Sequence, residues 1–180
     1  LEEDTFAKAS VATMRRAVWL GLNLLTAFVA AATIDLFRET LDKVVILAVL
    51  MPIVASMGGV AATQTLTIMV RGISLGQIHR SNLIWLASRE ALVGLGNGLI
   101  WAIVVALIVS LWFQDIVIAQ IIAIAMVFNL LVAVISGVAV PSILRYFRID
   151  PGIAGTVIVT TITDVAGFVS FLGLASLYYS

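Results

Sequence analysis

The chain has 180 residues, 62% of them hydrophobic and 11% charged, with ten basic and ten acidic side chains and a formal net charge of zero. A mean hydropathy of +1.18 excludes a water-soluble domain and indicates a polytopic membrane protein, with membrane lipids as its surroundings. The balanced charge predicts no nucleic-acid partner. Because the chain has no cysteine, a disulfide framework and thiolate metal sites are excluded as well.

Residues 1–16 precede the first apolar segment and are predicted to form a cytoplasmic linker or an interfacial helix. The acidic residues Glu2, Glu3 and Asp4 come first, which is unlike a secretory signal. Arg15 and Arg16 stand where a helix that enters a membrane is anchored at its surface. Residues 17–180 are then expected to form one transmembrane domain.

Five apolar segments follow, each close to the roughly 20 residues that a helix needs to cross a bilayer core of about 30 Å. They are predicted at Ala17–Ile34, Val44–Val70, Ala91–Phe113, Ile116–Leu144 and Ile153–Tyr179. Their hydrophobicity is continuous and does not alternate residue by residue, which favours helices over the strands of a β-barrel. We therefore expect an all-α protein with five transmembrane helices.

The basic residues predict the orientation of these helices. Only Arg38 and Lys43 lie in connections on one side, and the other eight of the ten lie on the opposite side: Lys8, Arg15, Arg16, Arg71, Arg80, Arg89, Arg145 and Arg148. Positively charged connections favour the cytoplasm. We expect a plasma (inner) membrane protein with its N-terminus in the cytoplasm and its C-terminus outside.

The second segment, MPIVASMGGVAATQTLTIMVRG, is irregular for a transmembrane helix. Pro52 removes a backbone donor, and the pair Gly58 and Gly59 lowers helical preference. Ser56 and Thr63 add hydroxyls on one face, so the segment is predicted to present oxygen ligands at membrane depth. A tight helix-packing seam explains the small residues equally well.

Most acidic residues fall near predicted helix ends or in loops and need no functional explanation, among them Glu90 at an expected helix start and Asp115 in a short turn. Asp164 differs, because it lies in the middle of the last segment, in IVTTITDVAGFVSFLGLA. Thr156, Thr160, Asp164, Gly167 and Phe171 recur at helical spacing and predict one stripe that faces protein or water. Gly167 would then allow another helix to approach or leave room for a hydrated ligand.

Oxygen is the ligand type that these segments offer, since the one histidine, His79, belongs to a predicted cytoplasmic loop. Hard cations prefer oxygen, and Mg²⁺ keeps most of its waters when proteins bind it. One aspartate per chain is little for a divalent ion, and a symmetric pair of chains would supply two. The candidate metal-binding residues are Asp164, Thr160, Thr63, Ser56, Gly58 and Gly59, and no tightly bound cofactor is expected.

Five stretches in order resemble the transmembrane domain of the MgtE family of magnesium transporters and channels: MRRAVWLGLNLLTA, the second segment quoted above, REALVGLGNG, the pattern around Asn129, Gly137 and Pro141, and DPGIAGTVIVTTITDVAGF. The resemblance covers nearly the whole chain. It implies a homodimer with a cation pore at the protomer interface, lined chiefly by the second and fifth helices, with Asp164 as the ion-binding aspartate. It also implies that a cytoplasmic Mg²⁺-sensing region commonly precedes the membrane domain.

The chain departs from the family pattern in two places. The family motif Gly-Gly-Asn-x-Gly-Thr-Gln has Val60 and Ala62 here in place of the asparagine and the later glycine, and Gly155, Thr156 and Val157 replace a Ser-x-Pro. Loss of the amide removes a donor and an acceptor for a hydrated ion. Selectivity for Mg²⁺ over Mn²⁺, Co²⁺ or Ca²⁺ is therefore expected to be altered.

The residues and the resemblance together predict that the protein is not an enzyme. We expect a channel or transporter for divalent cations, with Mg²⁺ favoured, that needs no ATP site, and the sequence has no GxxxxGK[ST] pattern. Two alternatives stay open. One is an intramembrane aspartyl hydrolase with two symmetry-related carboxylates. The other is a non-transporting sensor or assembly subunit in which Asp164 pairs with a partner helix.

Overall fold

The computed structural model describes residues 9–79 and 81–179. Over these residues the chain forms helices and no strands, and the helices are α1 (Ala9–Asp35), α2 (Arg38–Lys43), α3 (Ile46–Ser74), α4 (Leu83–Phe113), α5 (Ile116–Tyr146) and α6 (Ile153–Tyr179). All but the six-residue α2 are long and apolar enough to cross a membrane. The predicted all-α fold with five membrane-spanning helices is confirmed.

The two largest errors in the predicted boundaries are at helix starts, and both helices begin earlier than expected. The second predicted span also ends at Ser74 instead of Val70. The first helix begins at Ala9 instead of Ala17, so the described part of the predicted 1–16 segment continues directly into the first span. The third predicted span, α4, begins at Leu83 instead of Ala91, which places Arg89 and Glu90 inside it. In both cases polar residues near a helix end looked like connections, although no proline or glycine interrupts the helix there.

The connection between the first two spans contains a short helix, α2, where the sequence predicts a loop. At the other turn on the same side, Asp115 directly precedes α5, and its Oδ1 accepts hydrogen bonds from the backbone N–H groups of Val117 (2.9 Å) and Ile118 (3.0 Å). This is an N-cap, which satisfies two otherwise unpaired donors. Asp115 therefore has a structural role, as its predicted position in a turn suggested.

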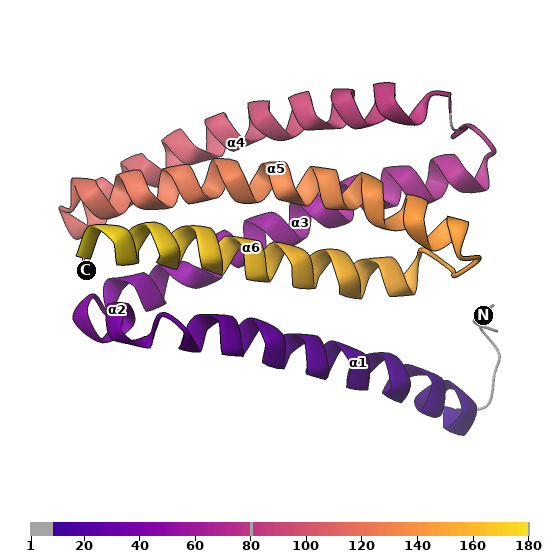
Figure 1. Ribbon diagram of the computed structural model, residues 1–180, viewed down its shortest axis with the longest axis horizontal. Helices are drawn as coiled ribbons and strands as arrows, with labels where there is room; N and C mark the ends of the chain where they lie inside the picture. Colours follow the sequence, from indigo (N-terminus) through magenta and orange to yellow (C-terminus); the bar gives the residue numbers. More distant parts are fainter. Residues whose placement is uncertain (1–8, 80, 180) are drawn as a thin grey trace.

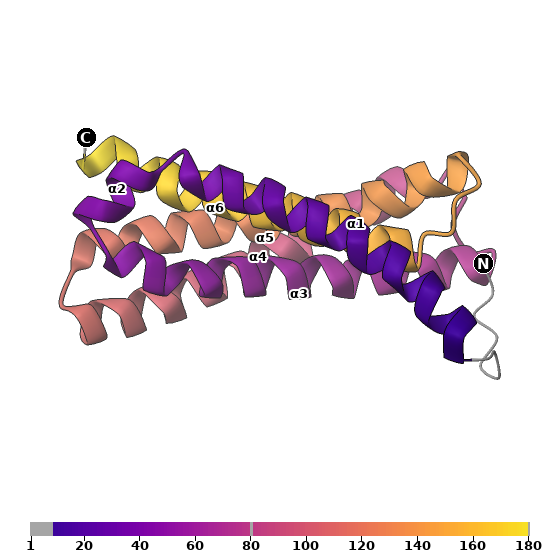
Figure 2. The same ribbon diagram turned by 90° about the horizontal axis from the view of Figure 1, so that it is seen from below.

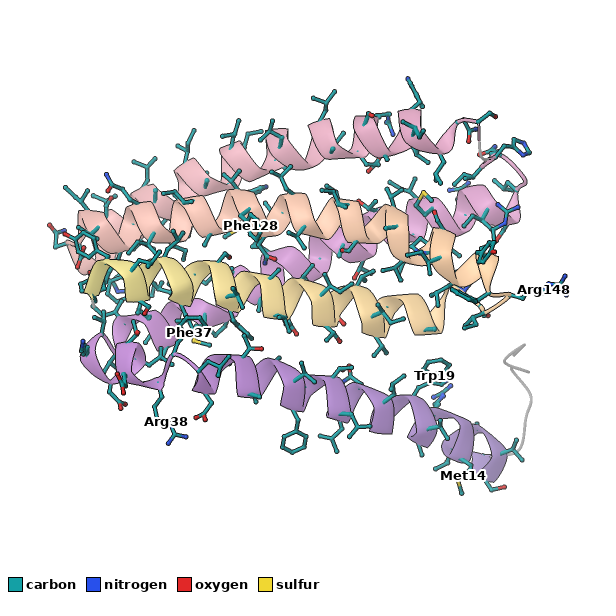
Figure 3. All side chains as sticks on the ribbon, in the orientation of Figure 1. Met14, Trp19, Phe37, Arg38, Phe128 and Arg148 are labelled. Carbon is teal, nitrogen blue, oxygen red and sulfur yellow. The ribbon has the colours of Figure 1, made fainter. Side chains whose placement is uncertain are left out.

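Figure 1 shows α4, α5, α6 and α1 side by side in a row, with α3 crossing behind them. The α3–α4 and α5–α6 connections lie at the end of the bundle nearer the N-terminus, and α2 and the C-terminus lie at the other end. Figure 2 shows the same division of the connections between two ends. Arg148 and Arg38 mark these opposite ends in Figure 3.

The core lies around α5, which packs against α3, α4 and α6. In the most apolar part of each helix, 61% of residues are buried in α5 but only 11% in α1, which packs mainly against α6. Trp19 points from α1 toward α6 (Figure 3) and is half-buried there. A single chain therefore leaves much apolar helix surface for lipid or for another chain.

Close helix contacts depend on glycine at two positions of this core. A Cβ on Gly137 of α5 would lie 2.7 Å from the Cβ of Thr65 and 2.9 Å from the carbonyl oxygen of Ala62, both on α3. A Cβ on Gly94 of α4 would lie 2.4 Å from a methyl group of Val134 on α5. All three distances are shorter than real contacts, so these helix pairs approach closely only because glycine has no side chain.

Candidate cation site

Asp164 lies on α6, 11 residues or about 16 Å along the helix from Ile153. Its side chain is half-buried in an open groove of about 540 Å³ between α3 and α6. The groove, called here the Asp164 groove, is lined by Ala55, Ser56, Gly59, Val60, Thr63, Gln64, Thr67, Thr160 and Asp164. Folding thus brings together Asp164, Thr160, Thr63, Ser56 and Gly59, five of the six residues singled out from the sequence.

The threonines of the groove present their oxygens as acceptors. The hydroxyl of Thr63 donates to the carbonyl oxygen of Gly59 at 2.7 Å, and that of Thr160 donates to the carbonyl oxygen of Thr156 at 2.8 Å. A hydroxyl has one hydrogen and two lone pairs. Because each hydrogen is used within its own helix, the lone pairs remain for the waters around a cation.

The carboxylate of Asp164 has no hydrogen-bond or ion-pair partner among the residues that the structure describes. An ionised carboxylate at membrane depth is unfavourable without compensation by another charge or by water. The groove is open to the outside of the chain, so water, a cation or a second chain can supply that compensation. α3 and α6 meet at its floor, where a Cβ on Gly59 would lie 3.9 Å from a methyl group of Thr160.

Gly58 does not line the groove, although it was predicted among the cation ligands. It is buried on a different face of α3, where an added Cβ would clash with Nδ2 of Asn129. Gly58 and Gly59 are adjacent and therefore point about 100° apart around the helix. α3 also continues unbroken through both glycines and Pro52. The carbonyl groups of Gly58 and Gly59, which were expected to be freed by a break in the helix, therefore belong to a continuous helix.

The predicted stripe on α6 also divides into two parts. Thr160 and Asp164 line the groove, whereas Gly167 and Phe171 are buried in the core. A Cβ on Gly167 would lie 2.8 Å from Nδ2 of Asn129, so this glycine serves a close helix contact and not a space for a hydrated ligand. The same face of α6 is open at Asp164 and covered one to two turns further along.

Asn129 is a buried polar residue whose position the sequence did not predict. It is fully buried on α5, and its Nδ2 donates to the carbonyl oxygen of Val54 on α3 at 2.9 Å. Its side chain fills the space that Gly58 and Gly167 leave. Asn129 therefore sets the spacing of α3 and α6 directly behind the Asp164 groove.

Glu90 is the second residue that the sequence interpretation misjudged. The sequence predicts Glu90 at a helix start and without a function, but it is 4% exposed and lies inside α4. The four residues LIWL at positions 83–86 were the available signal, because an apolar run before the polar residues indicates that the helix has already begun. His79, by contrast, is exposed in the α3–α4 connection, outside the groove, as expected.

The profile of the MgtE family, described as a divalent cation transporter, matches residues 51–174. These residues include the whole Asp164 groove. The chain is also 29% identical over 171 residues to a protein named magnesium transporter MgtE from Bacillus subtilis, an alignment that covers 95% of this chain and 38% of the relative.

Proteins of the same name from Enterococcus faecalis and Thermus thermophilus are similar too. Their identities are 26% and 25%, each over 167 residues, and the alignments cover 93% and 91% of this chain. Those alignments cover 37% and 36% of the relatives. The chain thus spans a little over a third of the length of the curated relatives it matches.

Proposed function

Because the chain belongs to the MgtE family of divalent cation transporters, we propose that it conducts hydrated divalent cations, Mg²⁺ above all, across a membrane down their electrochemical gradient. The observation that carries this proposal is the Asp164 groove, in which a mid-helix carboxylate without a partner among the described residues stands among hydroxyl oxygens. Relatives of this chain are named magnesium transporters, which supports Mg²⁺ as the preferred cargo.

In this proposal the carboxylate of Asp164 attracts the cation and holds it through its water shell. Mg²⁺ dehydrates reluctantly, so contacts through bound water suit it better than a full set of protein ligands. Thr160, Thr63 and Ser56 accept hydrogen bonds from the outer side of that shell. Binding through water is weak enough for the ion to leave again, which conduction requires.

We further propose that the working unit is a homodimer. The groove is open along one side of the chain, and each chain supplies one groove carboxylate. A twofold axis along this face would place two Asp164 side chains on one passage and would cover part of the exposed apolar surface of α3 and α6. Two carboxylates match the charge of one divalent ion.

The basic residues support an orientation in a plasma membrane with the arginine-rich end in the cytoplasm. Arg71, Arg145 and Arg148 lie at the end of the bundle that carries the α3–α4 and α5–α6 connections, and Arg38 and Lys43 lie at the other. By the positive-inside rule the N-terminus is then cytoplasmic and the C-terminus outside. Residues 1–8, which belong to the segment predicted as a cytoplasmic linker or an interfacial helix, lie outside the described part of the chain.

Val60 lines the groove and is 54% exposed, so an apolar side chain stands where the family resemblance places an asparagine. A valine offers no hydrogen bond to a water shell. Discrimination between ions that differ mainly in how firmly they hold water is then weaker. We propose that this protein also conducts Mn²⁺ and Co²⁺, with Mg²⁺ still preferred.

Flux into liposomes tests the proposed function. An inside-negative potential of 100 mV favours entry of a divalent ion by about 4.6 kcal/mol, so uptake is expected without ATP and should rise with the potential. Mg²⁺, Mn²⁺, Co²⁺ and Ca²⁺ are compared with a fluorescent indicator inside the liposomes. Uptake of none of them, by protein that is folded and inserted, would refute the function, and strict exclusion of Mn²⁺ and Co²⁺ would refute the role given to Val60.

The two alternatives drawn from the sequence gain nothing from the comparisons. The family and the three relatives are described as transporters, and none is described as a hydrolase or as a sensor without transport. We therefore propose neither of them as a function of this chain.

A further inference from the structure

Glu90 is an acidic residue inside the membrane-spanning helix α4. It has no role in the permeation path proposed above. It lies seven residues, or about 10 Å, from the first residue of α4 and is 4% exposed. Acidic side chains are rare at such positions, and those that occur commonly mark ion pathways or are paired for structural reasons. The contacts of Glu90 decide between these two roles.

The carboxylate of Glu90 is only partly satisfied. Its Oε1 accepts a hydrogen bond from Nη1 of Arg89 at 2.9 Å, and its Oε2 accepts a long one of 3.4 Å from the hydroxyl of Thr65 on α3. A carboxylate has about four lone-pair positions, so half of them remain. The Arg89 side chain is 54% exposed, whereas that of Glu90 is 5% exposed, so the arginine approaches from the surface and the acid faces inward.

Glu90 lines a pocket of about 320 Å³ between α3, α4 and α5, called here the Glu90 pocket. A divalent ion with six waters needs roughly 200 Å³ at ~30 Å³ per water, so the pocket has room for one. Gln64, Thr65 and Asn97 also line it. Because Nδ2 of Asn97 donates to the carbonyl oxygen of Val93 at 3.0 Å, the amide oxygen of Asn97 remains available as an acceptor.

The Glu90 pocket adjoins the Asp164 groove. Val60 and Gln64, which are one helical turn apart on α3, line both the pocket and the groove. This turn of α3 lies between the two cavities. α4 and α6 begin at the same, arginine-rich end of the bundle (Figure 1). Glu90 lies seven residues from the start of α4, whereas Asp164 lies 11 residues from the start of α6. Glu90 is thus the acid nearer to the side that we assign to the cytoplasm.

We propose that Glu90 forms a second binding site for a hydrated divalent cation, on the arginine-rich side of Asp164. This proposal rests on the proposed function. Oε2 of Glu90 and the oxygens of Thr65, Asn97 and Gln64 receive the water shell of the ion. Arg89 is the counter-ion of Glu90 when no cation is bound, and it releases the carboxylate when one arrives.

A purely structural role gives opposite expectations. If Glu90 served only to tie α4 to α3 through Thr65, then removing Arg89 would loosen the contact and would create no ion binding. If Arg89 competes with the cation, removing it must strengthen cation binding. The sign of the Arg89 effect therefore separates the two roles.

Binding of Mn²⁺, followed by electron paramagnetic resonance on the purified full chain in nanodiscs, tests the proposal. In the Asp164→Ala background one Mn²⁺ site per chain is expected to remain. Glu90→Gln should weaken this site at least tenfold while keeping an acceptor for Thr65, and Arg89→Gln should tighten it severalfold. Asp115→Asn is the matched control. It preserves the cap of α5 at the other end of the bundle and should leave the affinity of this Mn²⁺ site unchanged.

The possible failures can be told apart. Loss of all Mn²⁺ binding in Asp164→Ala, with flux intact in the unaltered chain, would overturn the second site and leave the proposed function standing. Unchanged binding in Glu90→Gln, or weaker binding in Arg89→Gln, would also overturn it. Absence of both Mn²⁺ binding and flux in the unaltered, folded chain would overturn the function and the second site together.

Discussion

Replacing Asp164 by alanine is expected to reduce divalent-cation flux into liposomes at least tenfold. The carboxylate is the charged group of the Asp164 groove, and each tenfold change in occupancy corresponds to about 1.4 kcal/mol of interaction with the ion. Folding should be unaffected or improved, because the side chain has no partner among the described residues whose loss would be felt. Initial rates of Mg²⁺ and Mn²⁺ uptake at a fixed membrane potential measure the effect.

Asp115→Ala is the matched control for this substitution. Like Asp164→Ala, it removes one aspartate side chain, but this one caps α5. The loss of the cap costs about 1 kcal/mol of stability and leaves the groove intact. Flux per folded protein should therefore stay close to that of the unaltered chain. Equal flux in the Asp164 and Asp115 variants would remove Asp164 from the permeation path.

Replacing Gly137 by alanine is expected to destabilise the bundle by about 1–3 kcal/mol, as overpacked cores commonly are. The added Cβ would lie 2.9 Å from the carbonyl oxygen of Ala62, which is backbone and cannot rotate away, so α3 and α5 must separate. Since α3 carries most of the Asp164 groove, flux should fall as well. Thermal unfolding in detergent, followed by circular dichroism, measures the loss of stability.

Gly96→Ala controls for the intrinsic effect of alanine in a helix. Gly96 lies on α4 with nothing within 4 Å of an added Cβ, so its replacement should stabilise the helix by up to about 1 kcal/mol. The two glycine variants are thus expected to shift the unfolding temperature in opposite directions. A Gly137 variant as stable as the Gly96 variant would show that the close approach of α3 and α5 is not required.

The five spans were predictable because lipid imposes a length and a composition on every helix that crosses it. The groove was predictable in part, since Ser56 and Thr63 on α3 and Thr160 and Asp164 on α6 are polar where lipid would favour apolar side chains. The start of α4 was not, because Ser88, Arg89 and Glu90 have the composition of a connection. A polar residue inside a bundle lowers the hydropathy of its segment just as a loop residue does, so hydropathy alone does not distinguish the two.

The packing behind the groove could not be derived from the sequence. Gly58, Gly59 and Gly167 are each compatible with a pore lining or with a helix contact, and the choice depends on which helix lies opposite. Asn129 on α5 decides it, because its side chain occupies the space beside Gly58 and Gly167 and leaves Gly59 to the groove. Such a contact joins residues more than 35 positions apart, which periodicity along one segment does not reveal.

The central claim is that the Asp164 groove is a water-filled passage, and the chain's lack of cysteine allows a direct test. A cysteine introduced by Thr160→Cys is exposed to a charged, membrane-impermeant thiol reagent, with Ile103→Cys on the exposed apolar face of α4 as the comparison. The account predicts that Thr160→Cys reacts readily, that Mg²⁺ slows this reaction, and that Ile103→Cys does not react. A Thr160→Cys variant as unreactive as Ile103→Cys would contradict it.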